Sequence, residues 1–191
     1  MGAGLARAGA YLPEGAAPFG QPPFIFVAQP GRAALLMPRE SRALVGSSAI
    51  DILGALTGIA LTPDDLRYVL SGTLPKTVQA RTGVAYGQDW WTIETSDGSL
   101  VYLRRVGDFR RIVAVRRSGW LSEYSELSGR VPAQVRLTSL NPASGSVDLT
   151  VLLSQVRINT TLDAATFVLD IPPDAVPMTL SELRARGPLR T

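Results

Sequence analysis

Short runs of branched and aromatic residues, separated by turn signals, occupy most of the chain on both sides of one helical stretch. Before that stretch, residues 4–46 alternate apolar runs with turns, and Gln29-Pro30-Gly31 between FIFVA and RAALLM is typical of a hairpin. After Lys76 the strand pattern returns, with Ser96-Asp97-Gly98 and Val106-Gly107-Asp108 as tight turns. This order predicts ten or so antiparallel strands rather than a parallel α/β sheet.

The exception is a helical insert at about residues 48–71. Ser48 with Asp51 three residues later has the pattern of a helix cap, and Thr62-Pro63-Asp64-Asp65 repeats it with proline at the first helical position. Gly72 is expected to end the second helix in a left-handed conformation. The apolar stripes are Ile52, Leu53, Leu56 and Ile59 on the first helix, and Leu66, Val69 and Leu70 on the second.

A third helix is expected near the end of the chain. In TLSELRARG, Thr179 and Glu182 have the spacing of a capping box, and Gly187 supplies a stop, which predicts a short helix at about residues 180–186. We therefore expect one domain over residues 1–191, with a single core. Its fold class would be mainly β, a strongly curved antiparallel sheet whose concave face is covered by the two inserted helices.

The composition restricts the chemistry. The 191 residues include neither cysteine nor histidine, which removes disulfides, the usual zinc sites, thiol nucleophiles and Ser-His-Asp triads. We expect no enzyme, no cofactor and no metal. An enzyme that uses only carboxylates, Ser, Tyr and Arg remains a minor alternative. No apolar run is long enough to span a bilayer, the first residues lack a signal-peptide pattern, and the net charge of +3 is too small to imply nucleic acid.

Three arginine doublets surround one predicted hairpin: Arg104-Arg105, Arg110-Arg111 and Arg116-Arg117. Because adjacent strand residues point to opposite faces, each doublet should divide between the two sides of the sheet. The doublets are interpreted as solvated strand ends, with an anionic headgroup, a partner surface or nucleic acid as alternatives. Trp90-Trp91 should divide likewise, with one ring in the core and the other at a partner or membrane interface, unless both are core.

Two acidic pairs have simpler explanations than catalysis. Asp64-Asp65 fits the chemistry of a helix start, where carboxylates meet the positive end of the helix dipole. Glu123 and Glu126 lie in a turn-rich stretch, and their spacing says nothing about the cleft that a glycosidase pair needs.

The arrangement of these segments resembles that of a known family. A hairpin, the paired helices AIDILGALTG…LTPDDLRYVLSG, meandering strands and the closing PAQVRLTS…VDLTVLLSQVRINTTLDAATFVLDIPPDA are similar to the LolA/LolB-like superfamily of bacterial lipoprotein carriers and receptors. The resemblance covers most of residues 5–175 and is nearest to the uncharacterised lipoproteins of that superfamily. Family members usually begin with a signal peptide, often a lipidated cysteine, so the chain looks N-terminally truncated.

What the resemblance implies is a half-barrel sheet with a helical lid over an apolar cavity for acyl chains of lipoproteins or phospholipid. It also implies a periplasmic or outer-membrane location, membrane association only through the missing N-terminal anchor, and a possible envelope protein partner. The cavity and lid residues would be Ile52, Leu53, Leu56, Ile59, Leu66, Val69, Leu70, Trp91, Ile93, Val101, Leu103, Val113 and Val115.

Two readings of the inserted helices stay open. They can form a movable lid, which Gly54 and Gly58 favour because each weakens the first helix by up to about 1 kcal/mol relative to alanine. They can equally be ordinary core, in a structural or scaffold domain with a solid interior that binds another envelope protein. The second reading predicts that charges at Leu53 or Leu70 unfold the domain.

Overall fold

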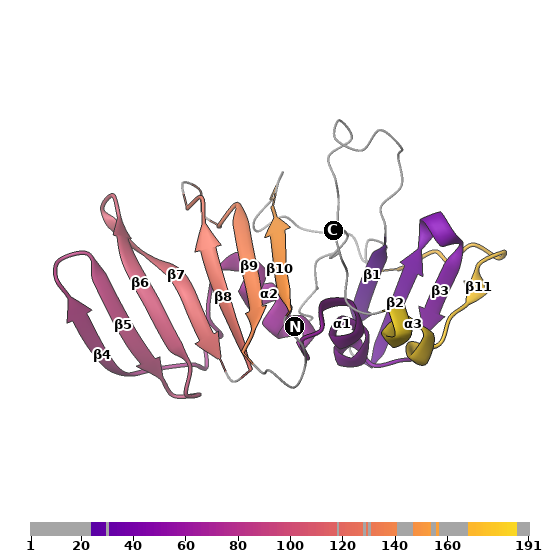
Figure 1. Ribbon diagram of the computed structural model, residues 1–191, viewed down its shortest axis with the longest axis horizontal. Coiled ribbons are helices and arrows are strands. Elements are labelled where there is room, and N and C mark those ends of the chain that lie inside the picture. Colours follow the sequence, from indigo (N-terminus) through magenta and orange to yellow (C-terminus); the bar gives the residue numbers. More distant parts are fainter. Residues whose placement is uncertain are drawn as a thin grey trace. The chain divides into compact units, whose positions relative to one another are not determined.

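The structure is a computed structural model that describes residues 24–29, 31–117, 119–127, 129, 131–140, 147–153, 156 and 168–186. The fold is mainly β, as predicted, and the described strands form two largely antiparallel sheets accompanied by three α-helices (Figure 1). One continuous sheet was expected. The chain divides instead into two compact units, Met1–Asp64 with Arg157–Thr191, and Asp65–Val156.

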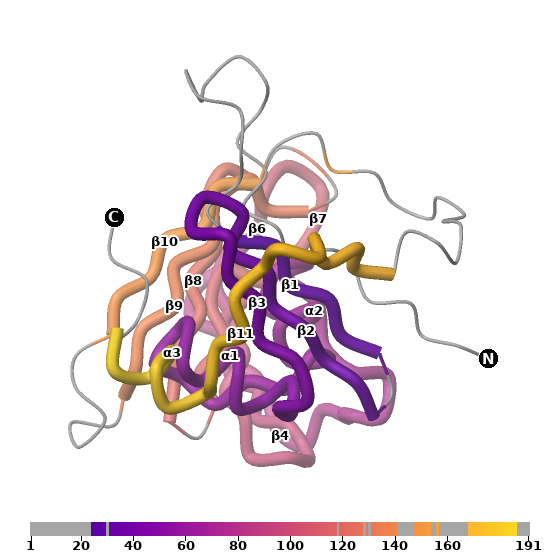
Figure 2. The backbone as a smooth tube through the Cα atoms, turned by 90° about the vertical axis from the view of Figure 1, so that its right-hand side faces the viewer, coloured from indigo at the N-terminus to yellow at the C-terminus, as the bar shows by residue number. Residues whose placement is uncertain are grey.

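The first unit contains a four-stranded sheet of order β1-β2-β3-β11. Its strands are β1 (Ile25–Gln29), β2 (Arg32–Met37), β3 (Arg42–Val45) and β11 (Val176–Pro177). β1 and β2 form the predicted hairpin, and a 3-10 turn at Pro38–Glu40 leads into β3. β11 lies parallel to β3 (Figure 2) and brings the C-terminal segment into this sheet. This parallel pair joins distant parts of the sequence and has no local signal.

Helix α1 (Ala49–Thr57) packs against β2 and against helix α3 (Leu180–Arg186). The Ser48 hydroxyl accepts a hydrogen bond from the Asp51 amide at 3.2 Å, which confirms the predicted cap. Gly58 ends α1 in a left-handed conformation (φ 73°) instead of continuing it. Ile59 therefore lies beyond the helix, although its side chain is buried. Gly58 supplies a stop, and only Gly54 lies inside the helix.

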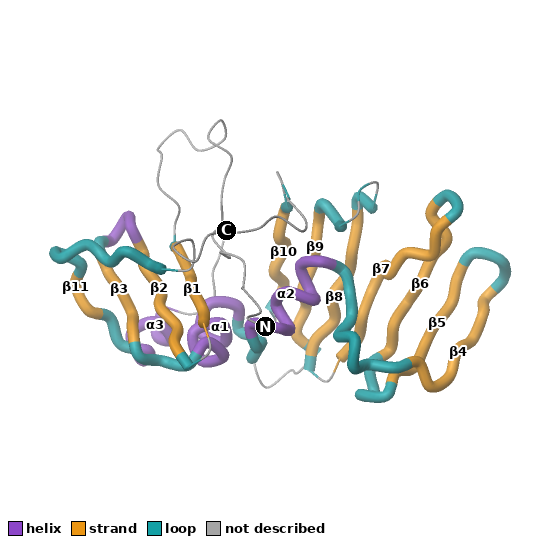
Figure 3. Tube along the Cα trace, turned by 180° about the vertical axis from the view of Figure 1, so that it is seen from behind, coloured by secondary structure: helices purple, strands orange, loops and turns teal. Residues whose placement is uncertain are grey.

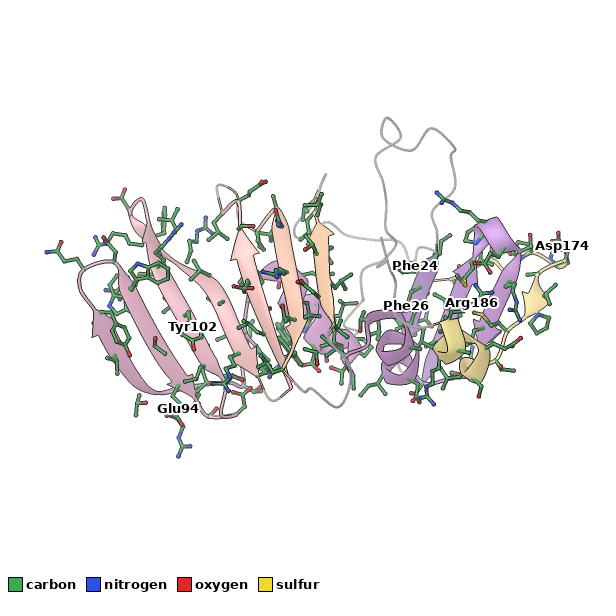
Figure 4. The ribbon with its side chains drawn as sticks, viewed as in Figure 1. Phe24, Phe26, Glu94, Tyr102, Asp174 and Arg186 are labelled. Carbon is green, nitrogen blue, oxygen red and sulfur yellow. The ribbon has the colours of Figure 1, made fainter. Side chains whose placement is uncertain are left out.

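Side chains from several elements form the core of the first unit. The fully buried members include Phe26 on β1, labelled in Figure 4, Leu35 on β2, Leu44 on β3 and Ile52 on α1. The predicted capping box of α3 is present, because the amide and hydroxyl of Thr179 donate to Glu182 at 2.7 and 2.9 Å.

The second unit is built on a seven-stranded sheet of order β10-β9-β8-β7-β6-β5-β4. The strands are β4 (Ala80–Tyr86), β5 (Trp90–Thr95), β6 (Leu100–Val106), β7 (Phe109–Arg117), β8 (Trp120–Ser125), β9 (Gln134–Ser139) and β10 (Asp148–Leu152). All neighbours are antiparallel. Seen from behind in Figure 3, helix α2 (Pro63–Ser71) crosses the sheet in front of β8 and β9. From Asp65 onward α2 belongs to this unit.

The local sequence signals predict both ends of α2 correctly. Pro63 is its first residue, and Gly72 follows its last turn in a left-handed conformation (φ 62°), both as predicted. The strands expected before residue 24, the turn at 141–145 and the stop at Gly187 lie outside the described residues. Among the helices that the structure describes, none is long and apolar enough to cross a membrane.

Candidate functional site

The two faces of the seven-stranded sheet differ in what lies on them. The register places Ile93, Val101, Val115, Ser122 and Leu137 in one row across five strands, so their side chains share one face. Arg117 and Tyr124 lie on this same face, and both are next to α2: Arg117 bonds to its residue Asp65, and the ring of Tyr124 lies beside Gly72. We call this side the covered face and the opposite side the outer face.

Burial on the covered face decreases along the sheet. Side chains on β8 and β9, such as Ser122, Tyr124 and Val135, are buried, as are Val101 and Val115. Towards β4 the covered face carries four apolar side chains that are only half-buried, which we call the apolar strip: Trp91, Ile93, Leu103 and Ile112. Gly83 and Ala85 on β4, at the edge, are exposed. The apolar surface therefore extends beyond the part that is fully buried.

Arg117 forms an ion pair that links α2 to the covered face. Its Nη1 donates to Asp65 Oδ1 at 2.7 Å, its Nη2 donates to Asp97 Oδ2 at 2.7 Å, and its Nε donates to Ser99 Oγ at 3.3 Å. The guanidinium also lies 5.9 Å from the centre of the Trp120 ring. All three donor groups are engaged, and the side chain is only 20% exposed. A planar guanidinium suits such a junction because its donors have a fixed geometry.

The electrostatics of the junction follow from these bonds. Partial burial would raise the pKa of the Asp97 carboxyl, but hydrogen bonds from Thr95, Arg117 and Ser99 outweigh it and hold that pKa well below its usual range. Burial raises the pKa of Tyr124, whose phenol oxygen accepts a 2.9 Å hydrogen bond from the Ser122 hydroxyl. Asp97 thus stays ionised and paired with Arg117 through the neutral pH range.

The predicted cavity residues fall into two groups. Ile52, Leu53, Leu56 and Ile59 lie in the first unit with exposed fractions of 0, 3, 3 and 6%, packed as core with the four-stranded sheet. The others lie in the second unit: Leu66, Val69 and Leu70 on α2, and Trp91, Ile93, Val101, Leu103, Val113 and Val115 on the sheet. The second helix, from Asp65 onward, thus shares a unit with the predicted sheet residues, and the first helix belongs to the other unit.

Within the second group, positions differ in accessibility. Val69, Val101 and Val115 are buried, whereas Leu66 and Leu70 are half-buried. Val113 is the extra residue at an irregularity between β6 and β7, because Tyr102 pairs with Ala114 and Leu103 with Ile112.

The arginine and tryptophan doublets divide across the sheet as predicted. Trp90 pairs with Arg104 on the outer face, where the guanidinium lies 5.6 Å from the ring centre. Trp91 lies on the covered face, with Arg110 at 4.3 Å and Arg105 at 5.9 Å from its ring centre. Each tryptophan is therefore accompanied by arginine on its own face, which is an attractive cation–π arrangement.

Sequence reasoning missed two members of this region. Arg117 was interpreted as a solvated strand end, yet it forms an ion pair that joins α2 to the sheet, and nothing local distinguishes it from Arg116. Ile112 was not expected on the covered face, because the irregularity next to it shifts the alternation of β7. Asp65 has a role beyond the helix start, and Glu123 lies 3.7 Å from Arg136 in a surface charge cluster that includes Asp148.

Comparisons with protein-family models, with curated proteins and with solved structures each gave no match, so the covered face must be interpreted from its own chemistry.

Proposed function

We propose that this chain is a non-enzymatic lipid-binding protein of the bacterial cell envelope, of the LolA/LolB-like lipoprotein carrier or receptor type. The ligand would be an acyl chain of a lipoprotein or phospholipid. The observation that carries the proposal is the apolar strip: four large apolar side chains continue the buried surface of the covered face while keeping part of their own surface in solvent. Such a surface suits a flexible apolar ligand.

The energetics fit a reversible carrier. Each methylene that leaves water contributes about 0.8 kcal/mol, so several methylenes laid along Trp91, Ile93 and Leu103 give useful affinity. The four side chains of the strip are themselves uncharged, which fits an alkyl chain, and Arg110 and Arg105 lie only at its Trp91 end. Release requires only that the chain find a better acceptor.

In this proposal α2 is the movable cover. Asp65 joins it to the sheet through Arg117, while Leu66 and Leu70 keep part of their surface in solvent. Few buried apolar contacts mark an element that opens at low free energy, and Val69 is the one fully buried side chain of α2. The half-barrel of the family, and a periplasmic or outer-membrane location, belong to this proposal as well.

A specific observation favours a second function. The apolar side chains of α1 are buried in the first unit, with Ile52 fully buried, which supports a scaffold with a solid interior. A structural envelope domain that binds another protein would use such a core. The two functions differ in the second unit, where a scaffold has no use for bound lipid.

The test is titration of the delipidated full chain with the fluorescent fatty acid cis-parinaric acid, together with native mass spectrometry of the protein before delipidation. We expect saturable fluorescence enhancement and co-purified lipid. Ile93→Glu, which places a charge on the apolar strip, should weaken fatty-acid binding at least tenfold.

Thr92→Glu is the matched control, because Thr92 is the neighbouring half-buried residue on the same strand and faces the outer side. It should bind like the unmodified chain. A folded protein that shows no saturable binding, or equal binding by both variants, would exclude the lipid carrier and leave the scaffold.

A further inference from the structure

One end of the seven-stranded sheet is exposed on both faces. It consists of the β4–β5 and β6–β7 turns with their flanking residues, 86–91 and 104–111, and we call it the hairpin end. The register aligns Tyr86, Trp90, Arg104 and Arg111 in a single row across four neighbouring strands. Tyr86 and Trp90 are 60 and 45% exposed, and Phe109 at the next turn is 69% exposed. Aromatic side chains of this size are rarely left in solvent together without a partner.

The arginines of the hairpin end are placed in opposed pairs. Arg104 faces Arg111 on the outer face, and Arg105 faces Arg110 on the covered face. Like charges directly opposite one another on a sheet repel. In each pair one arginine has a partner within the protein: Arg105 forms an ion pair with Asp89, and Arg111 donates to the Gly129 carbonyl at 2.8 Å. The repulsion within each pair decreases when anions bind beside the guanidinium groups of Arg104 and Arg110.

The hairpin end carries more positive charges than negative charges. Four arginines stand against two aspartates, Asp89 and Asp108, in the hairpin end. Asp89 lies 3.2 Å from Arg105. Arg104 and Arg110 each contact a tryptophan ring, and within the described part of the chain neither forms an ion pair with a carboxylate. Both guanidinium groups keep donors for an external anion.

We propose that the hairpin end docks on the surface of an anionic lipid bilayer. The aromatic rings of Tyr86, Trp90 and Phe109 combine an apolar body with exposure at the turns, which suits the boundary between headgroups and acyl chains. Arg104 and Arg111 lie in the same row as Tyr86 and Trp90, and Arg105 and Arg110 lie one row nearer the β6–β7 turn. These arginines, on both faces, meet the lipid phosphates, which guanidinium groups bind with paired hydrogen bonds. Arginines on both faces suit insertion by the end of the sheet, because headgroups then surround it.

A single-stranded nucleic acid also uses arginine and aromatic rings, but it binds along one continuous face with bases stacked on successive rings. Here the arginines divide between two faces. That division favours the bilayer. The docking proposal shares Trp91 with the acyl-chain proposal, because Arg110 lies over its ring, but it uses the turns of the sheet and not Ile93 or Leu103.

The experiment is vesicle co-sedimentation of the full chain. Phosphatidylcholine vesicles with and without phosphatidylglycerol are compared at low and high salt. We expect binding to the anionic vesicles only, weakened by salt. Arg104→Gln with Arg110→Gln should weaken binding about thirtyfold, since each basic residue near an anionic surface contributes a factor of about five. Arg32→Gln with Arg116→Gln removes the same charge at exposed positions elsewhere and should bind within about threefold of the unmodified chain.

A second variant distinguishes insertion of aromatic side chains into the bilayer from electrostatic attraction to its surface alone. Phe109→Ser leaves the charge unchanged, and at this exposed position it should not affect folding, which the urea midpoint checks. It should reduce vesicle binding severalfold and reduce quenching of tryptophan fluorescence by brominated phospholipid.

Equal binding to neutral and anionic vesicles, or equal losses in the two double-arginine variants, would overturn the proposal. So would tighter binding to a single-stranded oligonucleotide than to anionic vesicles. Retained cis-parinaric acid binding in Arg104→Gln with Arg110→Gln shows that a loss of docking does not come from a loss of the acyl-chain site.

Discussion

Arg117 on β7 and Asp65 in the first turn of α2 are joined by a 2.7 Å ion pair, 52 residues apart in the sequence. The same guanidinium holds Asp97 in the β5–β6 turn at 2.7 Å. One side chain therefore connects a helix, a strand and a turn of the second unit.

Replacing Arg117 by methionine should destabilise the protein by about 2 kcal/mol, because it leaves the partly buried carboxylates of Asp65 and Asp97 without their charged donor. Urea unfolding followed by tryptophan fluorescence measures this loss. Arg116→Met is the control: Arg116 is exposed on the opposite face, and its loss should change the free energy of unfolding by no more than about 0.5 kcal/mol. Equal effects would show that the junction contributes nothing to stability.

The cap of α3 predicts a pH dependence. The Thr179 amide, then Arg42 and the Thr179 hydroxyl, lower the pKa of Glu182 from 4.5 to about 2. A lowered pKa means that the carboxylate stabilises the folded state above pH 4.5 and that this contribution disappears as the pH falls towards 2. Glu182→Gln should therefore be less stable than the unmodified chain at pH 7, with a difference that shrinks below pH 4.5. Thermal unfolding at several pH values checks this, and a constant difference would contradict it.

The buried stripe of α1 predicts a large and specific cost for truncation. Ile52 is fully buried, so Ile52→Ala should destabilise the protein by about 2–5 kcal/mol through lost burial and the cavity left behind. Ile50, two residues earlier on the same helix, is 40% exposed, and Ile50→Ala should cost less than about 1 kcal/mol. Urea denaturation distinguishes the two. A small effect at Ile52 would argue that α1 lies over a void.

Alanine substitutions at two glycines distinguish the cost of backbone strain from the cost of steric crowding. Gly107 has a φ of 60° with open space around it, so Gly107→Ala should cost about 1 kcal/mol from the left-handed conformation alone. At Gly72, with a φ of 62°, a new Cβ would also lie 3.2 Å from Pro132 Cδ. Gly72→Ala should therefore cost more than Gly107→Ala, about 2 kcal/mol, in the same unfolding assay. The reverse order would show that Pro132 gives way.

Local chemistry made several elements predictable. The caps at Ser48 and Thr179, proline at the start of α2 and glycine at its end act within four residues of their partners, and the structure has each of them in place. Strand alternation likewise predicted the division of Trp90 from Trp91. Interactions of this range depend on neighbours in the sequence, which a single chain displays directly.

The candidate site was only partly predictable. Most of the sheet residues expected at an apolar surface do share one face, because the period of a strand is fixed. Which of them are buried and which form the apolar strip depends on where α2 lies, and α2 is held by Arg117, a residue that looks the same in sequence as Arg116. The apolar stripe of α1 gave no indication of which sheet it would cover.

The sequence by itself determined a mainly β chain with two inserted helices and a terminal helix, through hydrophobic period, turn residues and caps. Only the tertiary structure decided that the strands form two sheets, that β11 joins β3, and that α1 and α2 pack with different sheets. The reason is physical: an apolar stripe specifies that a helix must be covered, whereas the partner that covers it is chosen by contacts between residues far apart in the chain.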